Sequence, residues 1–242
     1  DDGRQFVEVD RLERIEQALD GSDYVRMGNR PLAKVYGHKR LARSRSVILI
    51  SCHIDSLYDS YYAEVKGAEL WGTFDNSACN AILVEAMVTG LLPDQAVVSF
   101  TGDEEDESRG ADQTIDYLDR EGLFQNLEMV LTLDLTEEFF GRTHFSIENC
   151  FIEQTATKSV LRFDRKAELK HYLRSFVETD AFLRDADPDE SWQYDEHDLN
   201  CFSLCLPCRV LGRDMHASQG VTIRAESPQA YLDALTRLAH GI

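Results

Sequence analysis

The pattern that most constrains the fold is an alternation of short apolar segments with longer segments of helical periodicity. Residues 46–52, 95–100 and 128–134 are almost wholly apolar, as strands buried on both faces of a parallel sheet are. Two predicted helices, 78–92 and 110–121, separate them. Because strand, helix, strand, helix, strand is typical of a parallel sheet covered on both faces, the sequence predicts an α/β fold with three α/β/α layers.

Further elements are expected on either side of this core. An amphipathic helix is predicted over 6–19 from its apolar spacing, and Ser227-Pro228 suits the first turn of a final helix ending at His240. Short strands are expected at 32–36, 143–148 and 206–211, a helical stretch at 151–175, and an acidic irregular loop at 176–198. With 242 residues and no repeat or linker, the chain is predicted to form one domain over 1–242.

Charge and hydropathy exclude several classes of partner. The chain has 44 acidic and 25 basic residues and a net charge of −19, so nucleic acid and an anionic membrane surface are poor partners. No stretch approaches the roughly eighteen consecutive apolar residues that a membrane helix needs. The first residues are neither a signal peptide nor a start methionine, so the sequence is expected to begin inside a longer gene product.

The six cysteines show no secreted disulfide framework. The spacing of Cys201, Cys205 and Cys208 suggests a thiolate metal cluster. Their apolar neighbours favour the alternative, in which they are small buried side chains of a helix-to-strand segment. A reducing, cytoplasmic setting is therefore expected.

Residues of the types that bind metals follow the predicted strands or stand at a helix start. They are His53, Asp55, Asp75, Glu104, Glu105, Asp134 and His216. A single acid after a strand is ordinary turn chemistry, but here such residues follow successive segments. Buried carboxylates resist ionising together unless a cation compensates them. Two histidines with several carboxylates suit zinc, with cobalt or manganese as alternatives.

Spacing predicts different roles within this set. His53 and Asp55 are two residues apart on an extended segment, so their side chains point to the same side. His53 is expected to bind metal while Asp55 orients it through the other ring nitrogen. Glu104 and Glu105 are adjacent and point differently. One is expected to bind metal and the other to act as a general base on a water whose pKa the metal lowers.

The ordered set resembles the co-catalytic two-zinc exopeptidases, which include aminopeptidases, carboxypeptidases and deacylases. The motifs that carry the resemblance are His53-x-Asp55, Asp75-Asn76, Glu104-Glu105 with Arg109-Gly110-Ala111, Asp134 and Met215-His216. Residues 104–111 are especially close to the leucyl- and deblocking-aminopeptidase-like branch. The resemblance covers about residues 47–221 and implies a zinc-exopeptidase-like fold with a mixed, mostly parallel central sheet.

The resemblance also implies a role for each residue. Asp75 would bridge two zinc ions, Glu104 would be the general base, and Asp55 would support His53. One zinc would be completed by His53 and Asp134, and the other by Glu105 and His216.

The chain differs from this family because it has no room for the inserted lid domain. Only nineteen residues separate Asp55 from Asp75, and about eighty separate Asp134 from His216, too few for an inserted lid domain. A lidless catalytic domain is expected, and the dodecameric assembly of relatives is not carried over. Gln219 stands where a glutamate often follows the histidine. Asp195 is the only match to a Gly-Thr-Asp-type element.

The predicted function is that of a zinc-dependent aminopeptidase acting on peptides in the cytoplasm, with homo-oligomerisation left open. The alternatives are a zinc carboxypeptidase or N-acyl amino-acid deacylase, and a non-catalytic homologue that serves as a binding subunit. A substrate carboxylate would call for an arginine, with Arg162, Arg209 and Arg213 as candidates. Tyr58, Tyr61 and Tyr62 either line the substrate cleft or pack a loop, and His197 is the one further histidine near the last core strand.

Overall fold

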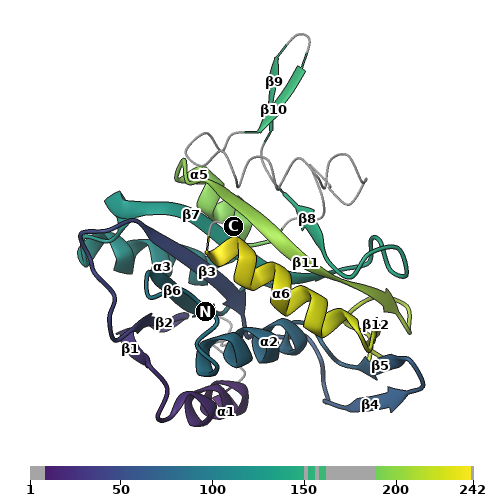
Figure 1. The fold of residues 1–242 in the computed structure, drawn as a ribbon. Helices are drawn as coiled ribbons and strands as arrows, with labels where there is room; N and C mark the ends of the chain where they lie inside the picture. Colours follow the sequence, from purple (N-terminus) through teal and green to yellow (C-terminus); the bar gives the residue numbers. More distant parts are fainter. Residues whose placement is uncertain (1–8, 150–151, 156–157, 162–188, 241–242) are drawn as a thin grey trace.

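The computed structural model describes residues 9–149, 152–155, 158–161 and 189–240 (Figure 1). The helices are α1 (Val9–Leu19), α2 (Ser77–Val88), α3 (Arg109–Arg120), α5 (Ser191–Glu196) and α6 (Ser227–Ala239), with a 3-10 turn at Phe124–Asn126. The strands are β1 (Tyr24–Asn29), β2 (Ala33–His38), β3 (Val47–His53), β4 (Ala63–Lys66), β5 (Glu69–Gly72), β6 (Ala96–Thr101), β7 (Leu127–Thr136), β8 (Ser146–Glu148), β9 (Ile152–Thr155), β10 (Lys158–Leu161), β11 (Cys201–Val210) and β12 (Val221–Arg224).

The main sheet has ten strands in the order β1-β2-β6-β3-β7-β11-β12-β5-β4, with β8 also paired to β11. Its centre is parallel, because β3 pairs with β6 and β7, and β7 pairs with β11, in the same direction. The margins are antiparallel, from β1 and β2 on one side to β12, β5 and β4 on the other. The carboxyl ends of the four parallel strands therefore meet at one edge, where open α/β sheets bind ligands.

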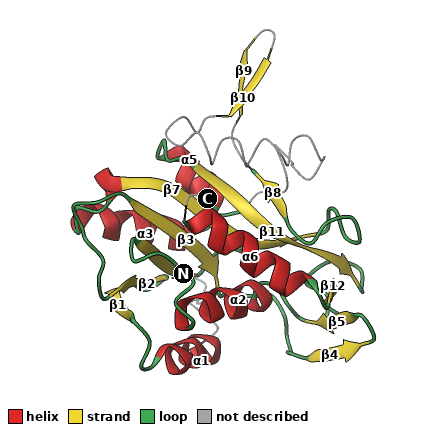
Figure 2. Cartoon of the chain, in the orientation of Figure 1, coloured by secondary structure: helices red, strands yellow, loops and turns green. Residues whose placement is uncertain are grey.

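Helices cover both faces of this sheet, as Figure 2 shows. Side chains alternate along β3, so Ile48 and Ile50 join one core cluster with α1, α2 and α6, while Val47 and Leu49 join a second with α3 and α5. Burying one such aliphatic side chain completely stabilises the folded state by about 1.5–3 kcal/mol. The predicted three-layer α/β/α fold is confirmed.

Some predicted elements are wrong or incomplete. The stretch 151–175 was expected to be helical, but its described parts are β9 and β10, which pair as an antiparallel hairpin. Strand β11 begins at Cys201, before the predicted 206, so the three neighbouring cysteines lie within one strand. The short strands β1, β4, β5 and β12 were not predicted, because brief strands at sheet margins depend on pairing with other segments.

The interpretation of Cys201, Cys205 and Cys208 as small buried side chains is confirmed. Cys52, Cys79, Cys201, Cys205 and Cys208 are all free and buried, and Cys150 lies outside the described residues. No thiolate belongs to the one candidate metal-binding group found among the described residues. In that same part of the chain, no helix combines the length and the apolar character that crossing a bilayer requires.

Candidate metal centre

The fold brings all seven residues singled out in the sequence to one edge of the sheet. His53 is the last residue of β3, Asp134 lies near the end of β7, and Asp75 lies between β5 and α2. Glu104 and Glu105 follow β6, and Asp55 follows β3 by two residues. His216 comes from the loop between β11 and β12. The roles of these residues stay predictions, but their assembly requires no rearrangement of the chain.

His53 is the centre of the group. Its Nε2 lies 3.4 Å from Asp75 Oδ1, 3.5 Å from Asp134 Oδ1 and 3.9 Å from Glu104 Oε2. Its other nitrogen, Nδ1, lies 3.5 Å from Asp55 Oδ1, on the side away from these three carboxylates. One ring nitrogen of His53 thus faces three carboxylates and the other faces Asp55.

Glu105 and His216 form a second group beside the first. His216 Nδ1 lies 3.4 Å from Glu105 Oε2, and its side chain is 36% exposed against 2% for His53. One ligand atom each from His53, Asp75 and Glu105 lie within 4.8 Å of one another. Asp75 and Glu105 thus join the buried group around His53 to the more exposed His216.

The donor set fits a divalent cation. Several polar atoms of the group are buried without any hydrogen-bond partner in the described structure: His53 Nε2, Asp75 Oδ1, Glu105 Oε1 and His216 Nδ1. Leaving such groups unpaired costs about 1–3 kcal/mol each, and more for charged groups. Nitrogen and oxygen atoms that converge with their lone pairs free are the ligands of zinc and of similar cations.

The electrostatics of the centre point the same way. Burial raises the pKa of Glu105 to about 8, helped by the charge of Asp75. Burial also raises the pKa of Asp134 to about 6, although His53 opposes the rise, and the pKa of Glu104 well above its ordinary value. Carboxyls crowded in this way cannot all ionise unless positive charge is brought in.

His53 shows the reverse effect. Burial alone would lower its pKa, but the surrounding carboxylates, Glu104 foremost, outweigh burial and raise the pKa well above its ordinary value. Burial would raise the pKa of Asp55, yet its contacts with His53 and with the backbone of Glu105 lower it. Asp55 is therefore poised to remain an anion, as a residue that orients a histidine ligand should.

Asparagine side chains fix the backbone beneath the ligands. Asn80 donates to His53 O at 2.8 Å, and Asn76 donates to Leu133 O, next to Asp134, at 2.6 Å. Both are buried, and both lie at the start of α2 just after Asp75. Asn80 stands among apolar residues of α2, so its role could not be predicted from the sequence. Asn76 belongs to a motif already singled out.

An ion pair shapes the loop that carries Glu104 and Glu105. Arg109 Nε and Nη2 donate to the two oxygens of Asp103 at 2.6 and 2.7 Å. Gly110 lets α3 begin close by, since a Cβ there would lie only 2.5 Å from Gly102 O. The pair was missed in the sequence, because nothing in a six-residue separation indicates that the loop folds back on itself.

Glu190 is a buried carboxyl that the sequence did not reveal. It is 3% exposed, directly precedes α5, and accepts a hydrogen bond from Thr101 Oγ1 at 2.7 Å. Thr101 pairs in register with His53 across β6 and β3, so Glu190 lies behind His53. Burial raises the pKa of Glu190 to about 7. An acid within a stretch expected to be an irregular loop carried no signal of this burial.

Other described residues named from the sequence do not line the cleft. His197 directly follows α5 and is exposed, and its Nε2 lies 3.6 Å from Asp112 Oδ1. Asp195 is not among the lining residues of the cleft. Arg209 pairs with Glu69 instead of facing the cleft. The three tyrosines Tyr58, Tyr61 and Tyr62 are likewise absent from its lining, and Arg162 lies outside the described residues.

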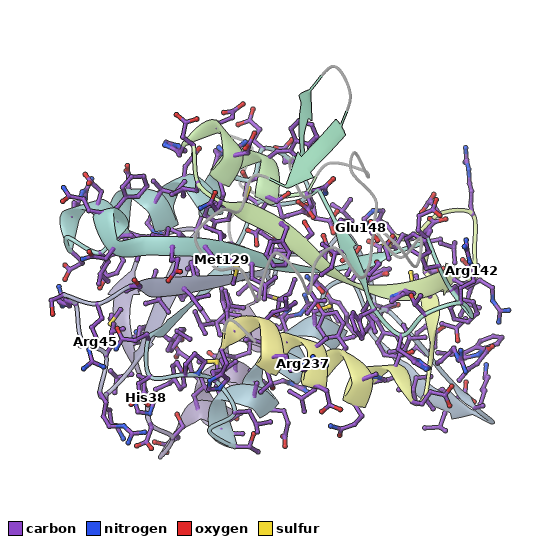
Figure 3. The ribbon with its side chains drawn as sticks, turned by 45° about the horizontal axis from the view of Figure 1, so that its top comes forward. His38, Arg45, Met129, Arg142, Glu148 and Arg237 are labelled. Carbon is purple, nitrogen blue, oxygen red and sulfur yellow. The ribbon has the colours of Figure 1, made fainter. Side chains whose placement is uncertain are left out.

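A cleft of about 940 Å³ opens over the ligands. Its lining includes Asp75, Glu104, Glu105, Asp134 and His216, and the far wall reaches Glu148 of β8, which Figure 3 labels. Its volume suits a short peptide segment. The centre thus lies at the base of a space that a substrate can enter.

Known proteins resemble the chain in sequence and in fold. Residues 33–191 match Peptidase family M28. A comparison with curated protein sequences gives no match. The structure of PhTET1-12s, described as a dodecamer in the asymmetric unit, is similar in fold with a TM-score of 0.62 and 12% identity, over 94% of this chain and 92% of that one.

Two proteins from Bacillus subtilis are similar in fold as well. BSAP, described as a zinc aminopeptidase, has a TM-score of 0.56 and 15% identity, over 86% of this chain but 49% of that one. YXEP, described as a dinuclear metal-binding peptidase from the M20 family, has a TM-score of 0.58 and 9% identity, over 97% and 92%. At these identities the structures support the fold alone. The sequence match, which spans well over half of the chain, shows that it belongs to peptidase family M28.

Proposed function

We propose that the protein is a zinc-dependent aminopeptidase that hydrolyses the amide bond after the first residue of a peptide. The proposal rests first on the convergence of unpaired nitrogen and oxygen atoms at the base of an open cleft. Such a donor set is costly to bury unless a cation occupies it. Zinc suits two histidines with carboxylates, and cobalt or manganese would be accepted in its place.

The distances support two cation positions. The inner position is defined by His53 and Asp134, whose ligand atoms are 3.5 Å apart, and the outer position by Glu105 and His216, whose ligand atoms are 3.4 Å apart. Asp75 is close to His53 and belongs to the same three-ligand group as Glu105, so it is the residue suited to bridge both. When bound, two such cations lower the pKa of water and polarise the scissile carbonyl.

Glu104 is proposed as the general base. It lines the cleft and its Oε2 lies 3.9 Å from His53 Nε2, which places the carboxylate beside the ligands without making it one of the closest contacts. The carboxylate would accept a proton from the attacking water and return it to the leaving amine. Burial first, and then the neighbouring carboxylates, raise the pKa of Glu104, and cations in the site would oppose that rise.

Asp55 is proposed as a positioning residue. Its Oδ1 faces His53 Nδ1, and its Oδ2 accepts a hydrogen bond from the Glu105 backbone N–H at 3.3 Å. One carboxylate therefore orients a ligand of the inner position and the backbone of a ligand of the outer one. Partners of this kind commonly change metal affinity or activity by 10- to 100-fold.

The charge of the cleft is the observation that favours an aminopeptidase. The three ligand carboxylates and Glu104 would balance two divalent cations, yet seven further acidic residues line the cleft, and its described lining includes no lysine or arginine. These acids are Asp106, Glu107, Glu137, Glu138, Glu148, Asp189 and Asp214. A negative cleft attracts the positive amino terminus of a peptide and repels the free carboxylate that a carboxypeptidase or deacylase substrate presents.

The partly described segment 150–188 adds no excess of either charge in its sequence. Residues 150–188 contain seven basic and seven acidic residues, so they add no net charge. The carboxypeptidase or N-acyl amino-acid deacylase alternatives would need a basic residue in the cleft to hold the substrate carboxylate.

Turnover of matched substrates tests the proposal. Aminoacyl-anilides with a free amine should be hydrolysed, and their N-acetylated counterparts should not. Glu104→Gln should lower kcat by about 10²–10⁴-fold while the protein retains its metal, because the amide cannot accept the proton. Faster hydrolysis of N-acyl amino acids would favour the deacylase instead. A protein without copurifying metal, on which Glu104→Gln has no effect in any assay, would be a binding subunit and not a hydrolase.

A further inference from the structure

His216 lies on a loop that has no regular secondary structure. Strand β11 ends at Val210 and β12 begins at Val221, and the intervening residues form turns. The backbone hydrogen bonds Ala217 N to Asp214 O and Gly220 N to Ala217 O stay within the loop. They shape the loop, but they do not hold it at a given distance from Glu105. Something outside the loop must fix the position of this ligand.

Two tyrosines from the segment after β3 make that contact. Tyr58 donates its hydroxyl to Met215 O at 2.7 Å, and Tyr62 donates its hydroxyl to Gln219 O. The Tyr58 ring also lies against the His216 ring, with centroids 6.4 Å apart. The two accepting carbonyls lie on either side of His216 in the sequence. We call this pair of tyrosines, with their two hydrogen bonds, the tyrosine clamp.

The clamp is itself attached to the rest of the centre. The Tyr62 backbone N–H donates to Thr73 Oγ1 and the Thr73 N–H donates to Tyr62 O, both at 3.1 Å. Thr73 lies between β5 and α2, two residues before Asp75, so one end of the clamp is fixed to the segment that carries the proposed bridging ligand. Tyr58 is 6% exposed, and its raised pKa, due first to burial and then to the charge of Asp75, agrees with a position against that ligand.

The other end of the segment is anchored from α1. Arg11 Nη1 donates to Ile54 O at 3.0 Å, and the Ile54 N–H donates to Thr101 O at 2.8 Å. Ile54 lies between His53 and Asp55, so the segment begins at the inner position. The segment 54–62 is therefore anchored by hydrogen bonds at both ends, beside His53 at its start and at the loop of His216 at its end.

We infer that the tyrosine clamp is the positioning element of the outer cation position, so that the two cations bind with unequal and separately adjustable affinity. The inference rests on the proposed two-cation function. The inner position draws on His53 at the end of a central strand, whereas the outer one depends on His216, whose side chain is 36% exposed against 2% for His53 and which is held through the clamp. Removing the clamp hydroxyl of Tyr58 should weaken the outer position about 10-fold and leave the inner one unchanged.

Calorimetric titration of the metal-free protein with Zn²⁺, in the presence of a competing chelator, tests this inference directly. The wild type should bind two cations with distinct affinities. Tyr58→Phe should weaken only the second by about 10-fold, and Tyr62→Phe should do so to a smaller extent, because Tyr62 is more exposed. Tyr36→Phe is the control, since it removes a hydroxyl that bonds to Glu16 and does not line the cleft.

The outcomes separate the inference from the proposed function. If Tyr58→Phe and Tyr62→Phe both bind two cations with wild-type affinity, the clamp has no positioning role although the two-cation site stands. A loss of affinity at both positions together would indicate general destabilisation and would equally refute it. A wild type that binds fewer than two cations would contradict the two-cation site and the clamp with it. Recovery of wild-type kcat by Tyr58→Phe at high Zn²⁺ would be the matching kinetic result.

Discussion

Replacing Glu190 by glutamine should make the stability of the protein less dependent on pH. The Glu190 carboxyl is buried, with Oε2 bonded to Thr101 and Oε1 without a partner among the described residues. Its pKa is about 7 in the folded chain against an ordinary value of 4.5. A carboxyl whose pKa is raised on folding binds more protons in the folded than in the unfolded chain. This carboxyl therefore lowers the free energy of unfolding progressively as the pH rises from 4.5 through 7.

The size of the effect follows from these two values. Between pH 5 and pH 8, the raised pKa of Glu190 should cost the wild type about 2.5 kcal/mol in its free energy of unfolding. Glutamine has nearly the same shape, can accept the Thr101 hydrogen bond and carries no charge. The free energy of unfolding of Glu190→Gln minus that of the wild type should therefore increase by about 2.5 kcal/mol over this range.

Urea unfolding of the metal-free proteins at pH 5, 6, 7 and 8 measures this difference. Glu196→Gln, at the exposed end of the same helix α5, is the matched control and should remain parallel to the wild type at every pH. A difference between Glu190→Gln and the wild type that stays constant from pH 5 to 8 would refute the reasoning. It would mean that the Glu190 carboxyl is ionised in the folded chain at no cost.

Three further predictions concern the metal centre and its cleft. Zinc binding at pH 7 should release protons, because Glu105, with a pKa of about 8, must ionise to bind. Calorimetry in buffers of different ionisation enthalpy measures the number of protons released, and a release of zero would contradict the prediction. Gly220→Ala should lower the free energy of unfolding by about 2 kcal/mol or more, because the new Cβ would lie 2.2 Å from Gly72 O and the backbone φ is +63°. An unchanged urea midpoint would disprove this clash. Peptides with a lysine or arginine near the amino terminus should have a lower KM than acidic ones, a preference that salt should weaken.

Much of the fold was visible in the sequence because the signals are local. The apolar run of β3 and the helical spacing of α2 each extend over one segment, and their alternation restricts the sheet to a parallel centre. The antiparallel margins were not visible. Strand β4 is exposed along its whole length, so its sequence has no buried face, and it exists because β5 pairs with it.

The candidate site divides in the same way. The order of His53, Asp75, Glu104-Glu105, Asp134 and His216 could be read from the sequence, because strand ends and ligand types are properties of short segments. Their partners could not. Asp103 and Arg109 meet only because the loop after β6 folds back, and Glu190 meets Thr101 across 89 residues.

The sequence by itself determined which residues could bind a cation and that they would gather at one edge of a parallel sheet, since both follow from residue type and periodicity. Only the tertiary structure decided how they are held. His216 depends on Tyr58, which is 157 residues away from the carbonyl it binds, and the electrostatics of His53 depend on four carboxylates from separate segments. Contacts of that range arise from the packing of the whole chain, and no local pattern encodes them.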